Sequence, residues 1–165
     1  MNRTAGFPLS TANFVWLLGS LCQAYRIPWD SAYALQRFRP PHTIKSLCEA
    51  GRQHGLRFGE TDTRAFGWAR GTYPLIAFRQ DDSAPAPVPL LVTRVEEGRL
   101  LYFAPATPGP LVASIEEFAS WIGPALLVAT REPVKPSVHD SSGRGQKKYG
   151  FHEFLREAFG FTGKW

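Results

Sequence analysis

Residues 89–105, PLLVTRVEEGRLLYFAP, decide the fold because they place two apolar runs on either side of a short polar turn. The residues between the runs, Glu-Glu-Gly at 96–98, are typical of the turn of a β-hairpin. Pro89 leads into the first run and Ala104 ends the second, so we expect the two outer ends of the hairpin to lie side by side. Such ends often present reactive side chains in enzymes, but neither of these residues can transfer a proton.

Three further runs with strand character accompany the hairpin: LRF at 56–58, YPLIAF at 73–78 and PALLVAT at 124–130. Between the hairpin and the last run, SIEEFASWIG at 114–123 predicts a helix of one to two turns. Its Ser114 and Glu117 have the spacing of a capping box. These elements together predict an antiparallel β-sheet with a short inserted helix.

The first 55 residues have helical rather than strand periodicity. Apolar side chains recur at three- and four-residue spacing, which predicts amphipathic helices. The helices are expected at 11–26, at about 30–38 and at 43–55, and the candidate N-terminal caps are Ser10 or Thr11, Asp30 or Ser31, and Thr43. The chain from 1 to 131 is therefore predicted to be one α+β domain, with three N-terminal helices packed on one side of the sheet.

The C-terminal part of the chain has a different composition. Residues 132–148, EPVKPSVHDSSGRGQKK, have the Pro/Gly/Ser-rich composition of a linker. Residues 149–165 return to a helical pattern and predict an amphipathic aromatic segment, whose apolar stripe needs a covering surface. That surface is the domain itself, a membrane interface or another part of a longer protein. No run in the sequence is long enough to cross a bilayer as a helix.

Composition limits the classes of partner. The 165 residues suffice for one domain with a hydrophobic core. The 19 basic and 14 acidic residues give a net charge of +5, which favours an acidic partner such as nucleic acid, anionic lipid or an acidic protein. The basic residues are scattered except in RGQKK at 144–148, and the sequence has no nucleic-acid recognition motif. We therefore do not expect a nucleic-acid partner.

The chain has two cysteines, Cys22 and Cys48, and its four histidines are His42, His54, His139 and His152. Each cysteine lies in an apolar helical pattern, where a thiol is usually a small core group. Neither has the spacing of a metal site, so we expect no metal or cofactor and a reduced, cytoplasmic setting. A pairing of Cys22 or Cys48 with a histidine, as in cysteine peptidases, stays open at this stage.

The order of these elements resembles that of the papain-like leader peptidases that cut after double-glycine motifs, at the N-termini of ABC exporters for bacteriocins. The resemblance covers residues 7–131, and it is best over 73–130, with YPLIAFR, the PLLVTRV/RLLYFAP hairpin and SIEEFASWIGPALLVA. It implies a papain-like α+β fold. As a set in this order the motifs are moderately specific.

The resemblance also implies where the catalytic groups of active members fall. Counting back from Tyr25 places the nucleophilic cysteine at Phe14 and the oxyanion-stabilising glutamine near Pro8. The catalytic histidine falls at Pro89, and the aspartate that orients it falls at Ala104. None of these side chains supplies a thiolate, a base or a carboxylate. We therefore expect a degenerate site and no peptidase activity, and the alternative is a divergent peptidase that uses Cys22 or Cys48.

A degenerate domain of this kind is similar to the N-terminal domain of ABC transporters in type I secretion, which export RTX toxins and adhesins. The resemblance implies a docking domain for unfolded, acidic substrate at the cytoplasmic face of the bacterial inner membrane. Residues 149–165 resemble the segment that leads toward the first membrane span of such transporters. The implied partners are then the membrane and nucleotide-binding domains, if the chain is a fragment; a stand-alone relative is the other reading.

The expected substrate contacts are Tyr25, Trp68, Tyr73, Phe78 and Arg79, with Arg64 and Arg70 as a basic rim. Phe78 and Arg79 end their strand where the related transporter domains carry an aromatic-Arg pair. Trp68 lies in a glycine-flanked loop, FGWARG, and we expect it to be exposed. Tyr25 and Phe78 also fit a core position, and the sequence leaves both interpretations open.

Overall fold

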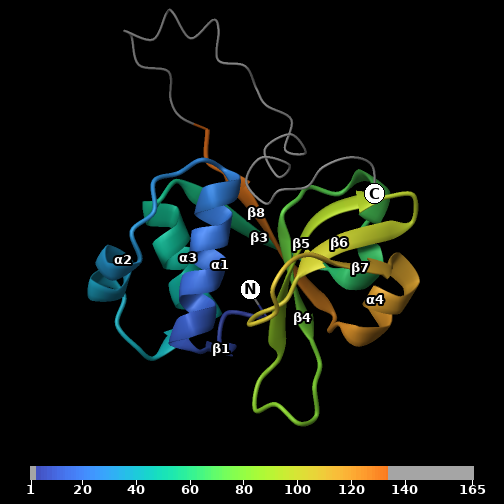
Figure 1. Ribbon diagram of the computed structural model, residues 1–165, viewed down its shortest axis with the longest axis horizontal. Helices are drawn as coiled ribbons and strands as arrows, with labels where there is room; N and C mark the ends of the chain where they lie inside the picture. The colour runs from blue at the N-terminus through green and yellow to red at the C-terminus, as the bar shows by residue number, and fades with distance from the viewer. Residues whose placement is uncertain (1–2, 134–165) are drawn as a thin grey trace, which may run out of the picture.

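The three N-terminal helices and the large antiparallel sheet occupy different halves of the molecule (Figure 1). The computed structural model describes residues 3–133. The helical half contains α1 (Thr11–Ala24), α2 (Ser31–Arg37) and α3 (Ile44–Gln53). The predicted segment 149–165 and all but the first two residues of the predicted linker 132–148 lie outside the described residues.

The three N-terminal helices begin at the predicted caps. The Ser10 hydroxyl accepts a hydrogen bond from the Asn13 backbone N–H (3.0 Å). The Asp30 carboxylate accepts the N–H groups of the first turn of α2, and Thr43 and Ser46 form a reciprocal capping box at α3. These side chains satisfy N–H groups that have no partner within the helix, so the helix starts are fixed by local sequence.

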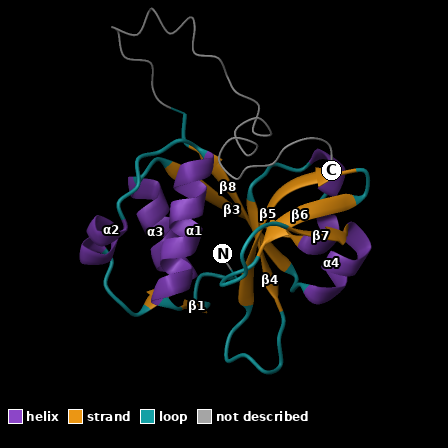
Figure 2. Ribbon diagram, in the orientation of Figure 1, coloured by secondary structure: helices purple, strands orange, loops and turns teal. Residues whose placement is uncertain are grey.

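The large sheet has the strand order β3-β8-β4-β5-β6-β7 and is antiparallel throughout. Its strands are β3 (Leu56–Asp62), β4 (Leu75–Arg79), β5 (Val88–Glu96), β6 (Arg99–Phe103), β7 (Leu111–Ser114) and β8 (Ala125–Arg131), and α4 (Ile115–Trp121) is the inserted helix (Figure 2). The predicted hairpin is β5–β6. Its turn residues Glu97 and Gly98 have φ angles of 52° and 76°, as a two-residue hairpin turn requires.

Several short elements were not predicted. Strands β1 (Pro8–Leu9) and β2 (His42–Thr43) pair with each other, and two residues are too few to give a periodic pattern. Edge strand β7 was also missed, and β3 continues four residues beyond the predicted 56–58 through polar residues. Two 3-10 turns, η1 (Thr63–Ala65) and η2 (Trp68–Arg70), follow β3.

The sheet buries both of its faces, because successive side chains of a strand point to opposite sides. On β4, Ile76 and Phe78 pack in the core under α1 and α3, whereas Leu75 and Ala77 pack in a second core with Phe118 of α4. The three N-terminal helices cover one face of the sheet, as predicted, and the inserted helix α4 covers the other face. Among the described residues, no helix is both long and apolar enough to cross a membrane.

Candidate functional site

The structure brings the two ends of the hairpin together as predicted. Pro89 is buried in β5 and pairs with Phe78 of β4. Phe103, the last residue of β6, pairs with Leu91, and Ala104 follows it directly, half-buried. The end of β5 that carries Pro89 therefore lies beside the end of β6 that carries Ala104. We refer to this region as the hairpin end.

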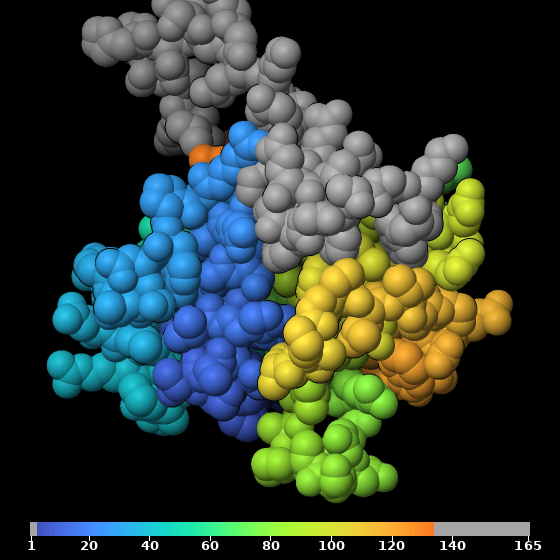
Figure 3. Space-filling view, in the orientation of Figure 1, coloured from blue at the N-terminus to red at the C-terminus, as the bar shows by residue number. Residues whose placement is uncertain are grey.

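The chain before α1 packs against the same end of the sheet. The Phe7 ring contacts the Phe78 ring edge-on, with centroids 5.2 Å apart and an interplanar angle of 80°. Pro8 follows in β1 and is exposed. Figure 3 shows the segment after β6, in yellow, beside the blue surface of the helical half. The hairpin end thus lies where the two halves of the molecule meet.

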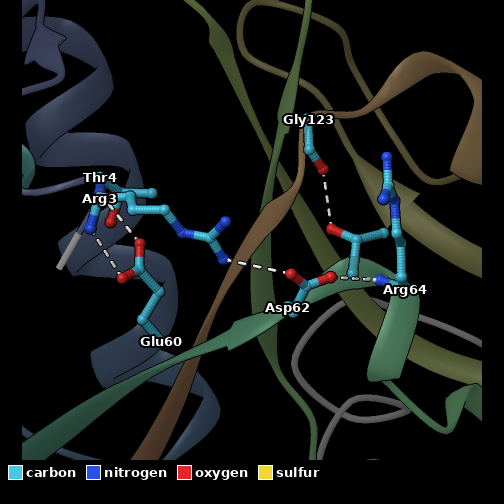
Figure 4. A network of polar contacts seen from close by, with 7 residues as sticks. Arg3, Thr4, Glu60, Asp62, Arg64 and Gly123 are labelled. Atoms are coloured by element: carbon cyan, nitrogen blue, oxygen red, sulfur yellow. Dashed lines mark hydrogen bonds and ion pairs between the residues drawn. The ribbon is translucent and has the colours of Figure 1, made fainter. Parts of the chain in front are cut away.

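A polar network fixes the N-terminal segment on this part of the molecule (Figure 4). The Glu60 carboxylate of β3 accepts the backbone N–H groups of Arg3 (2.8 Å) and Thr4 (3.0 Å). The Arg3 guanidinium lies 3.6 Å from the Asp62 carboxylate. These contacts hold the residues before Phe7 against edge strand β3 and thereby position Phe7 next to β4.

Phe14 is a core residue of the helical half. Its side chain is fully buried, and its ring stacks on the His42 imidazole at 4.2 Å with an interplanar angle of 16°. It also lies 6.4 Å from the ring of Phe38. Because α1 begins at Thr11, the position predicted by counting lies one turn inside the helix.

A hydroxyl–imidazole pair at the start of α1 was missed by the sequence reasoning, since its members are 31 residues apart. The Thr11 Oγ1 atom lies 3.3 Å from Nδ1 of His42, and Nε2 of His42 lies 2.9 Å from the Phe38 carbonyl oxygen. Since a carbonyl can only accept, Nε2 donates to it, and in the neutral tautomer with this proton on Nε2 the Nδ1 atom accepts from the Thr11 hydroxyl. The imidazole is only 2% exposed beneath the Phe14 ring, so this pair ties α1 to β2 within the core.

Both thiols lie in the core, as interpreted from the sequence. Burial raises the pKa of Cys22 to about 11. Burial likewise raises the pKa of Cys48 to about 11, and the nearby Arg52 charge lowers it by less. The Nδ1 atom of His54 donates a hydrogen bond to the Ala50 carbonyl oxygen (2.9 Å). The raised pKa values disfavour the thiolate form of both cysteines.

Tyr25 and Phe78 join the helical half to the sheet. The Tyr25 hydroxyl donates to the Ala129 carbonyl oxygen of β8 (2.7 Å), and burial raises its pKa to about 12. Phe78 is only 2% exposed in the core beneath the helices. The structure therefore does not place Phe78 on a surface that a ligand can reach, and the core interpretation of this residue is correct.

Trp68 is half-buried, so its side chain is less exposed than predicted. Its ring packs edge-on against Phe66 (5.0 Å) and Phe118 (6.0 Å), because η2 folds back over the face of the sheet that α4 covers. The Tyr73 hydroxyl donates to the Trp68 carbonyl oxygen at 2.5 Å, and burial raises the pKa of Tyr73 well above its usual range. These contacts fix the position of η2.

Arg79 is exposed at the end of β4. Its guanidinium carbon lies 4.9 Å from the ring centroid of Trp121, which is a cation–π contact. Trp121 is half-buried and packs 5.9 Å from Phe118, so Trp68 and Trp121 both contact the buried Phe118 ring. Trp121 was not predicted as a site residue, because its partner Arg79 lies more than forty residues earlier in the chain.

We refer to Trp68, Trp121 and Arg79 as the tryptophan surface. A hollow of about 420 Å³ lies between β3 and the segment 65–72. It is lined by Thr61, Ala65, Phe66, Gly67, Arg70, Gly71, Thr72 and Val128. Half-exposed aromatic rings with arginines nearby are typical of a surface that binds a polypeptide. The described residues include no group of three or more His, Cys, Asp or Glu that could hold a metal ion.

No protein-family model matches the sequence, and no curated protein matches it. Solved structures do share its fold. The peptidase domain of Streptococcus ComA, a bi-functional ABC transporter involved in a quorum-sensing pathway, has a TM-score of 0.60 at 17% identity, over 79% of this chain and 100% of that one. A double-glycine-motif protease from an AMS/PCAT transporter, in complex with the leader peptide, has a TM-score of 0.58 at 13% identity, over 79% of this chain and 96% of that one.

The N-terminal peptidase C39-like domain of the toxin secretion ATP-binding protein from Vibrio parahaemolyticus has a TM-score of 0.56 at 9% identity, over 72% of this chain and 96% of that one. The likeness is one of fold. The chain therefore has the α+β fold of the peptidase C39-like domains of ABC transporters, and the predicted fold class is confirmed.

Proposed function

We propose that this chain is a non-catalytic, peptidase-like domain of an ABC exporter, which binds an unfolded secreted protein before transport. The proposal is supported by the hairpin end, where Pro89 and Ala104 stand at the positions that the resemblance implies for the base and for its orienting carboxylate. Neither side chain can take up a proton, and both thiols are buried with raised pKa values.

The proposed ligand is an extended, acidic polypeptide of the RTX toxin or adhesin class. Its contacts are the tryptophan surface and the exposed Arg70, which together offer aromatic rings and positive charge. The net charge of +5 favours encounter with an acidic chain. The membrane and nucleotide-binding domains of a transporter are the proposed further partners, at the cytoplasmic face of the inner membrane.

A titration with an unfolded acidic polypeptide tests this proposal. Arg79→Gln removes the exposed charge of the tryptophan surface, and we expect affinity to fall about tenfold, as for loss of a charged contact at an interface. Arg99→Gln is the matched control, because Arg99 is also exposed but lies at the start of β6. Equal affinity of the two variants, measured by calorimetry, contradicts the proposal.

The second candidate is an active cysteine peptidase that cleaves double-glycine leader peptides. It is favoured by the fold shared with a double-glycine-motif protease in complex with the leader peptide. In that case Cys22 or Cys48 has to become accessible beside a histidine, which requires the core around it to open. Alkylation of the folded chain separates the two candidates, since only the peptidase predicts rapid modification of a thiol.

A further inference from the structure

Strands β3 and β7 are the two edges of the large sheet, and they differ in how many main-chain groups they leave unpaired (Figure 1). Along an antiparallel strand, residues whose N–H and C=O groups bond to the partner strand alternate with residues whose groups point away from it. An edge strand therefore presents every second residue to any further extended chain.

A hydrogen bond just beyond β3 shows which of its residues point outward. The Thr63 N–H donates to the Pro124 carbonyl oxygen (2.8 Å), and this pair continues the register of β3 with β8. By the alternation, the odd-numbered residues of β3 bond to β8, and Phe58 and Glu60 point away from the sheet. Within the described part of the chain, nothing bonds to the N–H and C=O groups of these two residues.

The opposite edge, β7, is less open. The Ile115 N–H donates to the Gly98 carbonyl oxygen (3.0 Å), in register with the pairing of β6 and β7. The outward residues of β7 are then Val112 and Ser114, and Ser114 is already used as the N-cap of α4. Strand β3 therefore offers the longer template for an added strand.

The N-terminal segment leaves these outward groups of β3 unpaired. The N–H groups of Arg3 and Thr4 bond to the Glu60 carboxylate, and the Arg3 guanidinium pairs with Asp62 (Figure 4). Glu60 lies opposite Leu127, whose side chain belongs to the core under the N-terminal helices. These contacts use side chains rather than the main chain of β3, and they offset the negative charge of both carboxylates.

The other face of β3 borders the hollow of about 420 Å³, which Thr61 and Val128 line. Gly59 lies directly opposite Val128 and is exposed. Apart from its chain neighbours, no atom lies within 4 Å of the position that a Cβ of residue 59 would take. The space over Gly59, between the hollow and the outer edge of β3, is therefore open.

Two exposed arginines lie beside this open face. Arg70 lines the hollow, and Arg64 lies in η1 directly after β3. Within the described residues, neither guanidinium forms an ion pair. Figure 4 shows the Arg64 side chain pointing away from Asp62. An acidic side chain on a polypeptide beside β3 is therefore attracted to two positive charges on this face.

The hollow is continuous with the tryptophan surface. Phe66 lines the hollow, and its ring packs edge-on against Trp68 with centroids 5.0 Å apart. A polypeptide that lies along β3 can thus continue over Phe66 to Trp68 on the same face of the sheet.

We propose that β3 binds the unfolded polypeptide as an added strand along residues 58–62. This inference rests on the proposed function for the class of ligand, and it adds the place and the mode of binding. The main-chain groups of Phe58 and Glu60 bond to the main chain of the polypeptide, as in other cases of strand addition to a sheet edge.

The alternation of side chains along a strand gives this site a sequence preference. Polypeptide side chains opposite Gly59 and Thr61 point to the face that carries Arg64 and Arg70, where acidic groups fit. Side chains between them point to the face of the half-buried Phe58 ring, where apolar groups fit. The preferred polypeptide therefore alternates acidic and apolar residues.

Calorimetry of the full chain with a peptide of about ten residues that alternates Val and Asp tests the proposal. Glu60→Pro removes an outward N–H group but no bond to β8, and affinity is expected to fall at least about tenfold. Glu60→Ala is the matched control, because it loses the same carboxylate and keeps the N–H group. Glu60→Ala and Val112→Pro, the same change on β7, are expected to alter affinity less than about twofold.

Two further measurements need no variant. Amide hydrogen exchange, followed by NMR at saturating peptide, is expected to slow at least about tenfold at Phe58 and Glu60 and to stay unchanged at Val112. A peptide of the same composition in the order Val-Val-Asp-Asp cannot present one kind of side chain to each face. It is expected to bind at least about fivefold more weakly than the alternating peptide.

Three results overturn the proposal. The first is equal affinity of Glu60→Pro and Glu60→Ala, when circular dichroism shows both variants folded, because binding then does not use the main chain of β3. The second is protection of Val112 in place of Phe58 and Glu60, which assigns the peptide to β7. The third is protection of Phe58 and Glu60 that depends on protein concentration and not on peptide, which assigns this edge to a second copy of the chain.

The outcome for β3 is separable from the outcome for the proposed function. If Arg79→Gln weakens binding of an unfolded acidic polypeptide and Glu60→Pro does not, the proposed function stands and the strand addition is wrong. If neither the alternating peptide nor the unfolded polypeptide binds the wild-type chain, the proposed function itself is wrong.

Discussion

Two regions meet at the end of β4, and they differ in how far their side chains are exposed. Phe78 lies in the core beside Phe7 and Pro89, where apolar groups fill the space between the sheet and the helices. Arg79, the next residue, lies on the other face and contacts Trp121 at the surface. The end of β4 therefore packs Phe78 between the two halves on one face of the sheet and exposes Arg79 for binding on the other.

The largest expected effect sharpens this comparison through stability. Phe78→Ala leaves a cavity between the sheet and the helices, so we expect the free energy of unfolding to fall by about 3–5 kcal/mol. Arg79→Ala, at the neighbouring position, is expected to cost less than about 1 kcal/mol because it removes one exposed cation–π contact. Urea titrations measure both; equal losses contradict the division between the two regions.

The buried thiols predict how stability depends on pH. The pKa of Cys22 is raised from 9.0 to about 11, so the unfolded chain loses this proton at lower pH than the folded chain does. Stability is therefore fully present below pH 9 and falls as the pH rises toward 11, by roughly 2–3 kcal/mol for this thiol. The Cys22→Ala variant is expected to lose less stability over the same range, as measured by urea unfolding at each pH.

The same burial predicts slow alkylation of the folded chain. At pH 8 only about one thiol in a thousand is ionised when the pKa is about 11, so iodoacetamide is expected to modify Cys22 and Cys48 far more slowly than it modifies unfolded chain. Mass spectrometry measures the rates with and without urea. Rapid modification of either cysteine in the folded chain favours the peptidase.

A smaller effect concerns binding by the tryptophan surface. Trp121→Ala removes the ring under Arg79, and we expect affinity for an unfolded acidic polypeptide to fall by about 2 kcal/mol, or roughly 30-fold. Tyr33→Ala is the aromatic control, because Tyr33 is 55% exposed but lies on α2 in the other half. If the Tyr33 variant loses as much affinity as the Trp121 variant, the assignment of polypeptide binding to the tryptophan surface is wrong.

Local sequence was sufficient where a structure depends on neighbouring residues. The capping residues and the Glu97-Gly98 turn are examples, because each is fixed by a few residues in a row. The burial of Trp68 could not be predicted, since its partner Phe118 lies fifty residues further along the chain. The Thr11–His42 pair and the contact of Arg79 with Trp121 depend in the same way on packing between distant elements.

The predicted site shows the same division. Pro89 and Ala104 are brought together by hairpin pairing, which the sequence pattern predicts directly. Phe14 was placed by counting along a helix, and the structure shows it one turn inside α1 and buried. The cap at Ser10 predicts where α1 starts, but which of its residues faces the sheet depends on packing between distant elements.

Mass spectrometry of a double-glycine leader peptide after incubation with the chain tests the central claim most directly. The account predicts an intact peptide at all incubation times, because it proposes that Pro89 and Ala104 at the hairpin end stand where a peptidase has its base and carboxylate. Cleavage after the second glycine that stops when Cys22 or Cys48 is replaced by alanine contradicts it and assigns the chain to the peptidases.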